Sequence, residues 1–414
     1  MKQSAKRIGI IGGGAAGLIA AITAAREGCN VTVFEKESRA GKKILVSGNG
    51  RCNISNTHLH PGDYFGFHAD FVSFALNTFD FHHFKKFCNS IGLHLHIHQD
   101  GRVYPLSNEA KSVHTLLLRE ATLLHVDLLT ECRVQALSKE PQGFVITTSE
   151  AIYDAFDAVL IATGSQAAEQ LGATDDGYHL AQALGHPTIT PYPCLVGLHL
   201  NSTLHSKLSG VKVYAELTLL INHQKMQHVT GDVLFTKYGI SGFATLDISQ
   251  AASLALHEHQ HVAIEINLLP HLSTQELGSR LAKFATQLRE HTVLNLLEGM
   301  VSTKIAPLLL QESNINAALT CDALNTKQIK KILHTMTQWR FEVSDTHGFK
   351  HAEVSGGGVC TEQIDPKTMH SRLHKGLYFA GEVLDIVGKR GGYNLHFAWA
   401  SGYLAATAMT RNES

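Results

Sequence analysis

Two side chains in this sequence could act as acids in catalysis, Cys52 and Tyr393. Cys52 lies in the loop VSGNGRCNISN, residues 46–56, and Tyr393 follows two consecutive glycines. A thiol or a phenolic hydroxyl can supply a proton to a substrate. A small cysteine can also serve only to pack a loop, so the residue type leaves both roles open for Cys52.

A glycine-rich turn near the N-terminus has the spacing of a dinucleotide-binding site. An apolar strand ends at Ile11, Gly12-x-Gly14-x-x-Gly17 follows, and a helix comes next. Gly12 permits the tight turn, Gly14 lets a pyrophosphate approach the backbone, and Gly17 lets the helix pack closely. A second strand ends at Glu35, whose carboxylate can accept hydrogen bonds from the adenosine ribose and disfavours a 2′-phosphate. The predicted cofactor-binding residues of this segment are Gly12, Gly14, Ala15, Ala16, Gly17, Glu35 and Lys36.

Two distant segments predict further strand ends beside the same ligand. Residues 157–165 form a buried strand that closes on Thr163 and Gly164, and residues 376–385 form another that closes on Gly381 and Glu382. Pieces so far apart suit a cofactor long enough to contact several strand ends, which favours FAD. An apolar helix then begins near Gly392 and Asn394, and its free N–H groups and positive dipole end can face an electron-rich ligand atom.

The bulk composition predicts a globular protein of two or three domains with reduced thiols. The 414 residues are 44% hydrophobic and 17% charged, and the net charge of -1 creates no global attraction to nucleic acid or an anionic membrane. Seven cysteines form no C-x-x-C pair, which indicates a cytoplasmic protein and excludes a flavin-coupled dithiol mechanism. The apolar run 8–25 superficially resembles a signal peptide, but its glycines have the spacing of strand, turn and helix, and we expect no membrane span.

The 27 histidines raise the question of a metal site, most of all in LHLHIHQ. Alternation places His94, His96 and His98 on one face of a strand, with no nearby cysteine or carboxylate to complete a site. We therefore expect a solvated strand face, and no metal.

Several segments together resemble the BaiN/RdsA (YhiN-like) family of FAD-dependent oxidoreductases, within the glutathione-reductase-like flavoproteins. The resemblance covers nearly the whole chain. It is carried by GGGAAG with Glu35, AGKKILVSGNGRCNISN (40–56), GDVLFTKYGISGFATLDIS (231–249), and SGGGVCTEQIDPKTMHSRLHKGLYFAGEVLD with GGYNLHFAWASGY (355–403). One departure is Phe243, where the family usually has proline.

The resemblance implies an FAD held by the 12–17 turn, Glu35, the 41–53 loop and the backbone around Val134 near the adenine. Gly381, Glu382 and Asn394 would face the ribityl chain and isoalloxazine. The further cofactor-binding residues expected are Lys43, Gly50, Arg51, Asn53, Val134, Thr163, Gly164, Gly381, Glu382, Gly392 and Asn394. Family members reduce carbon–carbon double bonds in substrates as different as uridine in ribosomal RNA and bile acids.

The sequence pattern in the middle of the chain predicts an inserted domain. From Thr188 the pattern becomes that of antiparallel strands, with Asn222-His223 and Gly231-Asp232 as turn candidates, and amphipathic helices follow. We expect an α/β fold, a Rossmann-like FAD-binding domain interrupted by an inserted β domain and a helical cap. The expected domains are 1–187 with 345–414 for FAD, 188–270 with 332–344 for the β domain, and 271–331 for the cap.

The leading functional prediction is an FAD-dependent reductase of uridine in ribosomal RNA. The alternatives are a small-molecule ene-reductase or amine oxidase, and a non-catalytic flavin-binding protein. Between residues 165 and 345 there is no second G-x-G-x-x-G, so NAD(P)H would visit only as a transient electron donor. A basic path for RNA would use Arg39, Lys42, Lys43, Arg51, Lys389 and Arg390, and Lys327, Lys330 and Lys331 on a cap helix. The sequence does not predict the oligomeric state.

Overall fold

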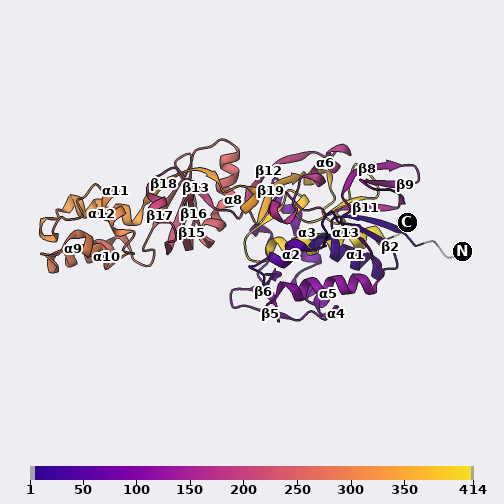
Figure 1. Ribbon diagram of the computed structural model, residues 1–414, viewed down its shortest axis with the longest axis horizontal. Helices are drawn as coiled ribbons and strands as arrows, with labels where there is room; N and C mark the ends of the chain where they lie inside the picture. The colour runs from indigo at the N-terminus through magenta and orange to yellow at the C-terminus, as the bar shows by residue number, and fades with distance from the viewer. Residues whose placement is uncertain (1–4, 412–414) are drawn as a thin grey trace. The chain divides into compact units, whose positions relative to one another are not determined.

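The computed structural model describes residues 5–411, which belong to two compact units. Among the described residues, one unit contains 5–192 and 354–411, and the other is Pro193–Glu353 (Figure 1). The second unit therefore begins at Pro193, shortly after Thr188, where the sequence pattern changes. The predicted fold class is confirmed, because a Rossmann-like domain is interrupted by a segment that contains a barrel and helices.

The core of the first unit is a five-stranded parallel sheet. Apolar residues occupy the central strands, which are buried along nearly their whole length. The strand order is β20 (Leu377–Phe379), β11 (Ala158–Ile161), β1 (Arg7–Ile11), β2 (Asn30–Phe34) and β7 (Asp127–Leu129).

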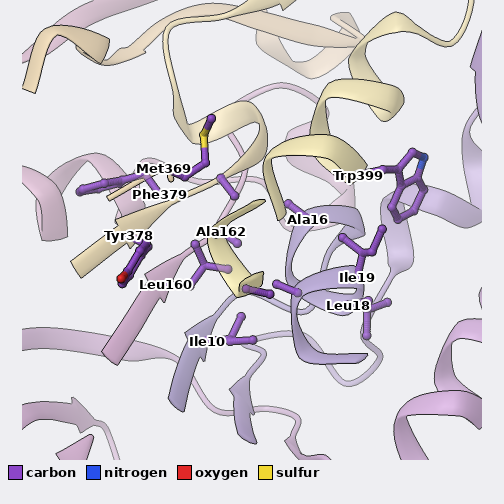
Figure 2. Packing of buried hydrophobic residues seen from close by; sticks show 14 of the residues in the cluster. Ile10, Ala16, Leu18, Ile19, Leu160, Ala162, Met369, Tyr378, Phe379 and Trp399 are labelled. Carbon is purple, nitrogen blue, oxygen red and sulfur yellow. The ribbon is translucent and has the colours of Figure 1, made fainter. Parts of the chain in front are cut away.

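Two helices pack closely together against this sheet. They are α1 (Ala15–Arg26) and α13 (Tyr393–Thr410), and a Cβ atom at Gly402 would lie 2.4 Å from the Ala16 carbonyl oxygen. Figure 2 shows side chains of β1, β11, α1 and α13 in this core. Because α1 also packs on α5 (Ala110–Leu123), its apolar residues are buried on most sides of the helix. This arrangement holds the glycine-rich turn rigidly at the end of β1.

Smaller elements surround the sheet. The helices are α2 (Lys42–Val46), α3 (Val72–Thr78), α4 (Phe81–Ser90) and α6 (Asp176–Ala183). One small sheet contains β3 (Ser55–Asn56), β6 (Arg102–Pro105) and β5 (Leu95–Ile97). A second contains β8 (Val134–Glu140), β9 (Gly143–Thr148) and β10 (Ile152–Phe156). A third pairs β4 (Tyr64–Phe65) with β21 (Val387–Gly388). A two-stranded sheet joins β12 (Thr188–Cys194) and β19 (Val354–Val359).

The second unit contains a closed antiparallel barrel and a group of helices. The barrel order is β13 (Leu198–Leu200), β16 (Gly239–Ser241), β15 (Gln224–Phe235), β14 (Lys212–Ile221), β17 (Val262–Asn267) and β18 (Trp339–Thr346). The helices are α7 (Leu204–Lys207), α8 (Phe243–His257), α9 (Thr274–Gln287), α10 (Val293–Glu298), α11 (Ala306–Glu312) and α12 (Thr326–Thr337). The division of this unit into a β domain and a cap stays a proposal.

Of the two predicted turns, one is correct and one is wrong. Asn222 and His223 connect β14 to β15 with φ of 49° and 67°, as a tight hairpin requires. Gly231 and Asp232 instead lie inside β15. A Cβ atom at Gly231 would lie 3.5 Å from the Ala244 side chain, so this glycine accommodates the packing of α8 on the strand.

No helix among residues 5–411 is long and apolar enough to cross a membrane. The three histidines of LHLHIHQ are exposed at and around β5.

A buried histidine links α13 to two other segments. His396 is fully buried, with Nδ1 2.8 Å from the Ser55 hydroxyl and Nε2 2.9 Å from the Phe79 carbonyl oxygen. Because a carbonyl only accepts, Nε2 carries the proton and Nδ1 accepts from Ser55. Burial lowers the pKa of His396 to about 4, so its ring is neutral at pH 7.

We expect this histidine to make the first unit acid-sensitive. A lowered pKa favours the folded state above the ordinary histidine value near 6.5, and the contribution disappears as the pH falls toward 4. Its full size is about 3 kcal/mol. Urea unfolding at pH 7 and pH 4.5 should show a loss of stability that His396→Asn reduces. His82→Asn, at an exposed histidine, is the control. Equal losses in wild type and His396→Asn would contradict this assignment.

Candidate functional site

The carboxyl ends of four parallel strands meet at one edge of the sheet. Gly12 follows β1, Glu35 follows β2, Thr163 lies just after β11, and Gly381 lies just after β20. In open α/β sheets this edge is where ligands bind. The structure thus brings together residues that the sequence predicts from four separate segments.

The glycines of the first turn have three different surroundings. A Cβ atom at Gly12 would lie 2.4 Å from the Ala162 carbonyl oxygen, and one at Gly17 would lie 1.9 Å from the Gly12 carbonyl oxygen. Both glycines are therefore required by the fold itself. A Cβ atom at Gly14 would meet nothing within 4 Å, and its φ of -78° suits any residue. The open space at Gly14, beside the N–H groups of Ala15 and Ala16 that begin α1, fits a pyrophosphate.

Glu35 is fixed by two backbone donors. Its Oε2 accepts from the Gly13 N–H and its Oε1 accepts from the Glu37 N–H, each at 2.9 Å. Burial raises the pKa of Glu35, while the two hydrogen bonds act in the opposite direction. The carboxylate keeps free lone pairs, which fit ribose hydroxyl donors.

The segment beside Glu35 links the sheet edge to β8. Lys36 lies 2.5 Å from the Thr174 hydroxyl and 3.6 Å from the Asp176 carboxylate, which also binds Arg133 at 2.6 Å. Val134 follows and is buried at the start of β8. The backbone around Val134 is thereby held close to the second strand end.

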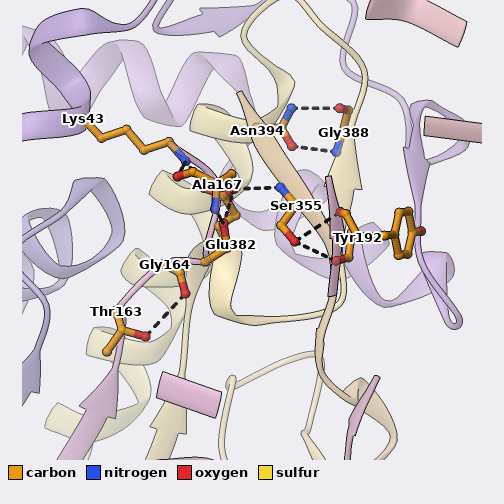
Figure 3. Close-up of polar contacts among 11 residues, drawn as sticks. Lys43, Thr163, Gly164, Ala167, Tyr192, Ser355, Glu382, Gly388 and Asn394 are labelled. Atoms are coloured by element: carbon orange, nitrogen blue, oxygen red, sulfur yellow. Dashed lines mark hydrogen bonds and ion pairs between the residues drawn. The ribbon is translucent and has the colours of Figure 1, made fainter. Parts of the chain in front are cut away.

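Glu382 connects three parts of the first unit (Figure 3). Its Oε2 binds the Lys43 ammonium group at 2.8 Å, and its Oε1 accepts from the Ser165 hydroxyl at 2.7 Å and from the Ser355 N–H at 3.0 Å. Lys43 also lies 3.5 Å from the Ala167 carbonyl oxygen. One carboxylate therefore fixes α2, the loop after β11 and the start of β19.

The other residues at these strand ends leave open space or pack tightly. Gly164 has a φ of 77°, and a Cβ atom there would meet nothing within 4 Å. The Thr163 hydroxyl donates to the Gly164 carbonyl oxygen at 3.4 Å (Figure 3). Gly381 donates its N–H to Ser401, and a Cβ atom there would lie 3.0 Å from that of Ala16.

The 46–56 loop exposes some residues and buries others. Gly50 has a φ of 79° and open space at the Cβ position, and Arg51 lies over the Tyr104 ring at 5.4 Å. With its amide nitrogen as donor, Asn53 binds the carbonyl oxygens of Ser55 and Val103. Gly50 and Arg51 therefore belong to the accessible part of the loop, together with Val46, Gly48 and Asn49, and Asn53 stabilises the loop's shape.

Cys52 is completely buried in the same loop. Burial raises the pKa of its thiol to about 11, despite a hydrogen bond with Ser47. Its φ of 56° is unusual for a residue with a side chain, so the loop holds it against a local preference. A buried, protonated thiol favours the packing role.

The start of α13 is tied to neighbouring backbone. Asn394 accepts from the Gly388 N–H at 2.7 Å and donates to the Gly388 carbonyl oxygen at 2.8 Å (Figure 3). A Cβ atom at Gly392 would lie 2.2 Å from the Ser55 carbonyl oxygen. The Tyr393 hydroxyl donates to the His58 carbonyl oxygen at 3.3 Å, and burial raises its pKa. Asn394 and Tyr393 therefore shape the helix start.

Several predicted basic residues are neutralised by carboxylates. Lys42 pairs with Glu37 at 2.9 Å, and Lys389 pairs with Asp63 at 2.6 Å. With Lys43 paired to Glu382, three of the six basic residues predicted for an RNA path in the first unit are in ion pairs.

The sequence did not reveal three residues that shape the site, Ser165, Ser355 and Tyr104. Ser165 could have been found from its position directly after Gly164, because that position follows a predicted strand end of the site. Ser355 begins the SGGG segment, and no local pattern marks Tyr104 as the partner of Arg51.

Fold and site together define a dinucleotide-binding α/β protein. The family model described as "HI0933-like protein Rossmann domain" matches residues 6–408, and the chain belongs to this family. It is an FAD-dependent oxidoreductase.

Three relatives cover nearly the whole chain. The 3-dehydro-bile acid delta(4,6)-reductase of Clostridium scindens is 36% identical, over 97% of this chain and 98% of its own. The ribosomal RNA dihydrouridine synthase of Haemophilus influenzae is 30% identical, over 99% of this chain and 100% of its own. The Escherichia coli protein of the same name is 30% identical, over 98% of each chain.

Proposed function

We propose that this protein reduces a carbon–carbon double bond with FAD, and that its substrate is uridine in ribosomal RNA. The observation that carries the FAD site is the convergence of four strand ends on the open space at Gly14. The two relatives named ribosomal RNA dihydrouridine synthase support the substrate. With ribosomal RNA as its substrate, the protein would act in the cytoplasm.

The residues of the sheet edge fit FAD in distinct roles. Gly14 and the first N–H groups of α1 would hold the pyrophosphate, and Glu35 would accept from the ribose hydroxyls. The backbone near Val134 would border the adenine. Gly50, Arg51 and Gly164 would border the remaining part of the cofactor, because the two glycines have open space at the Cβ position. Lys43 and Glu382 would keep the surrounding loops in place.

Reduction adds a hydride to one carbon of the double bond and a proton to the other. When bound and reduced, FAD supplies the hydride. NAD(P)H would deliver the electrons as a transient donor. The chain's own residues would bind and orient the two reactants, and water could supply the proton, since Cys52 is buried and Tyr393 donates to a backbone carbonyl.

We expect Cys52→Ala to retain both flavin and turnover. The change removes a small buried side chain and should lower stability by about 1 kcal/mol through the cavity that it leaves. Absorbance of the bound flavin and product formation under saturating substrate are the measurements, with Cys88→Ala as a buried-cysteine control. Normal flavin content with abolished turnover would show instead that the thiol takes part in the chemistry.

The substrate proposal is tested by the dihydrouridine content of ribosomal RNA. RNA from cells with the gene should contain dihydrouridine that is missing after deletion and restored by the wild-type gene. A Gly14→Val gene is the control that should not restore it. Unchanged RNA after deletion would refute this substrate.

A second candidate is reduction of a small conjugated enone. The bile acid reductase from Clostridium scindens, with 36% identity, favours it. Rapid oxidation of the reduced protein by such an enone, without any effect on ribosomal RNA, would establish this alternative.

A further inference from the structure

Three aromatic rings of the second unit are stacked face to face. The ring centroids of Tyr238 and His347 are 3.7 Å apart with planes 12° from parallel, and those of His347 and His351 are 4.1 Å apart at 19°. Tyr238 and His347 are half-buried, whereas His351 is exposed. This ring column, Tyr238–His347–His351, thus runs from the protein toward solvent.

The inner part of the ring column is fixed by polar and steric contacts. His199 Nε2 lies 2.9 Å from His347 Nδ1, and the His347 N–H donates to the Gly197 carbonyl oxygen at 2.8 Å. A Cβ atom at Gly197 would lie 2.6 Å from the Tyr238 hydroxyl, so glycine is needed for the ring to fit. The outer ring therefore rests on a preorganised support.

Two exposed lysines are sequence neighbours of residues in the ring column. Lys237 and Lys350 adjoin Tyr238 and His351 in sequence, and both are exposed. Neither lysine has an ion-pair partner among residues 5–411. Burial, with His351 and His199 nearby, lowers the pKa of His347, so the middle ring stays neutral at pH 7. The ring column thus has a neutral middle ring, and Tyr238 and His351 each have an exposed lysine as a sequence neighbour.

We infer that the exposed ring of His351 stacks an unpaired base of an RNA substrate, while Lys237 and Lys350 contact its phosphates. This inference rests on the proposed ribosomal RNA substrate. Unpaired bases stack on aromatic side chains, histidine included, and basic residues follow the backbone. Such stacking tolerates any base, so the ring column would position the strand rather than select its sequence.

The test is the affinity of the full-length flavoprotein for a fluorescently labelled, uridine-rich single strand of roughly ten nucleotides, measured by anisotropy. His351→Ala should weaken binding roughly 5- to 100-fold. His351→Phe keeps a ring and should bind within about twofold of wild type. Lys350→Ala should weaken binding and reduce the slope of log affinity against log salt by roughly 0.7.

His228→Ala is the matched control, because His228 is an exposed histidine of the same unit and lies on β15. Flavin content and circular dichroism of each variant report on folding. Wild-type affinity in His351→Ala would overturn the inference, as would an equal loss in His351→Phe and His351→Ala. Failure of the wild type to bind the strand would overturn it too.

Dihydrouridine formation separates this inference from the proposed function. If wild type and His351→Ala bind the strand equally and both form dihydrouridine, the role of the ring column in RNA binding is refuted and the proposed function is supported. If binding depends on His351 but no dihydrouridine forms, the proposed function is refuted, and the role of the ring column in RNA binding is supported.

Discussion

Replacing Gly14 by valine should produce a folded protein that no longer binds FAD. The side chain would enter the space left for the pyrophosphate, and we expect the affinity for FAD to fall roughly 100-fold or more, equivalent to about 3 kcal/mol. The protein itself should tolerate valine, because a Cβ atom at Gly14 meets nothing within 4 Å and φ is -78°. FAD titration of the stripped protein, with its unfolding temperature, gives both quantities.

Two other glycines make this experiment specific. Gly299→Val places the same side chain on an exposed turn of the second unit and should leave FAD binding unchanged. Gly17→Val should disrupt the fold, since its Cβ atom would lie 1.9 Å from the Gly12 carbonyl oxygen. A yellow Gly14→Val protein with wild-type affinity would place the pyrophosphate elsewhere.

Glu382→Ala should be the most damaging single change among the polar residues of the site. It leaves the Ser165 hydroxyl and the Ser355 N–H without their acceptor and removes the partner of Lys43. We expect a loss of about 2–4 kcal/mol in the free energy of unfolding, together with weaker FAD binding. Urea unfolding and FAD titration measure these effects.

Glu382→Gln separates the hydrogen bonds from the ion pair. The glutamine oxygen can still accept from Ser165 and Ser355, so only the pair with the 40%-exposed Lys43 side chain is lost, at about 0.5–1 kcal/mol. Glu362→Ala removes an exposed carboxylate that pairs with His68 and serves as control. If Glu382→Ala were no more destabilising than this control, the linking role of Glu382 would be wrong.

The strand ends of the site were predictable because each is marked by a local pattern. Glycine spacing and short apolar runs identify the positions of Gly12, Glu35, Thr163 and Gly381, and parallel pairing brings them to one edge. What these patterns leave open is which partners each side chain meets.

Those partners depend on distant packing. Glu382 binds Lys43, 339 positions away, and Ser165, 217 positions away, and no local pattern links them. Gly231 and Asp232 looked like a turn because both residue types favour turns, yet packing of α8 on β15 uses the small side chain of Gly231 inside a strand. The burial of Cys52 likewise involves a distant segment, because Cys88 of α4 lies near its thiol.

The account is tested most directly by a single-turnover reaction without oxygen. The purified flavoprotein is reduced, mixed with unmodified ribosomal RNA, and followed through the absorbance band of oxidised flavin while dihydrouridine is quantified. We predict that the band returns and that one dihydrouridine forms for each flavin oxidised. A flavin that remains reduced in the presence of RNA and of a conjugated enone would contradict the proposal that this protein reduces carbon–carbon double bonds.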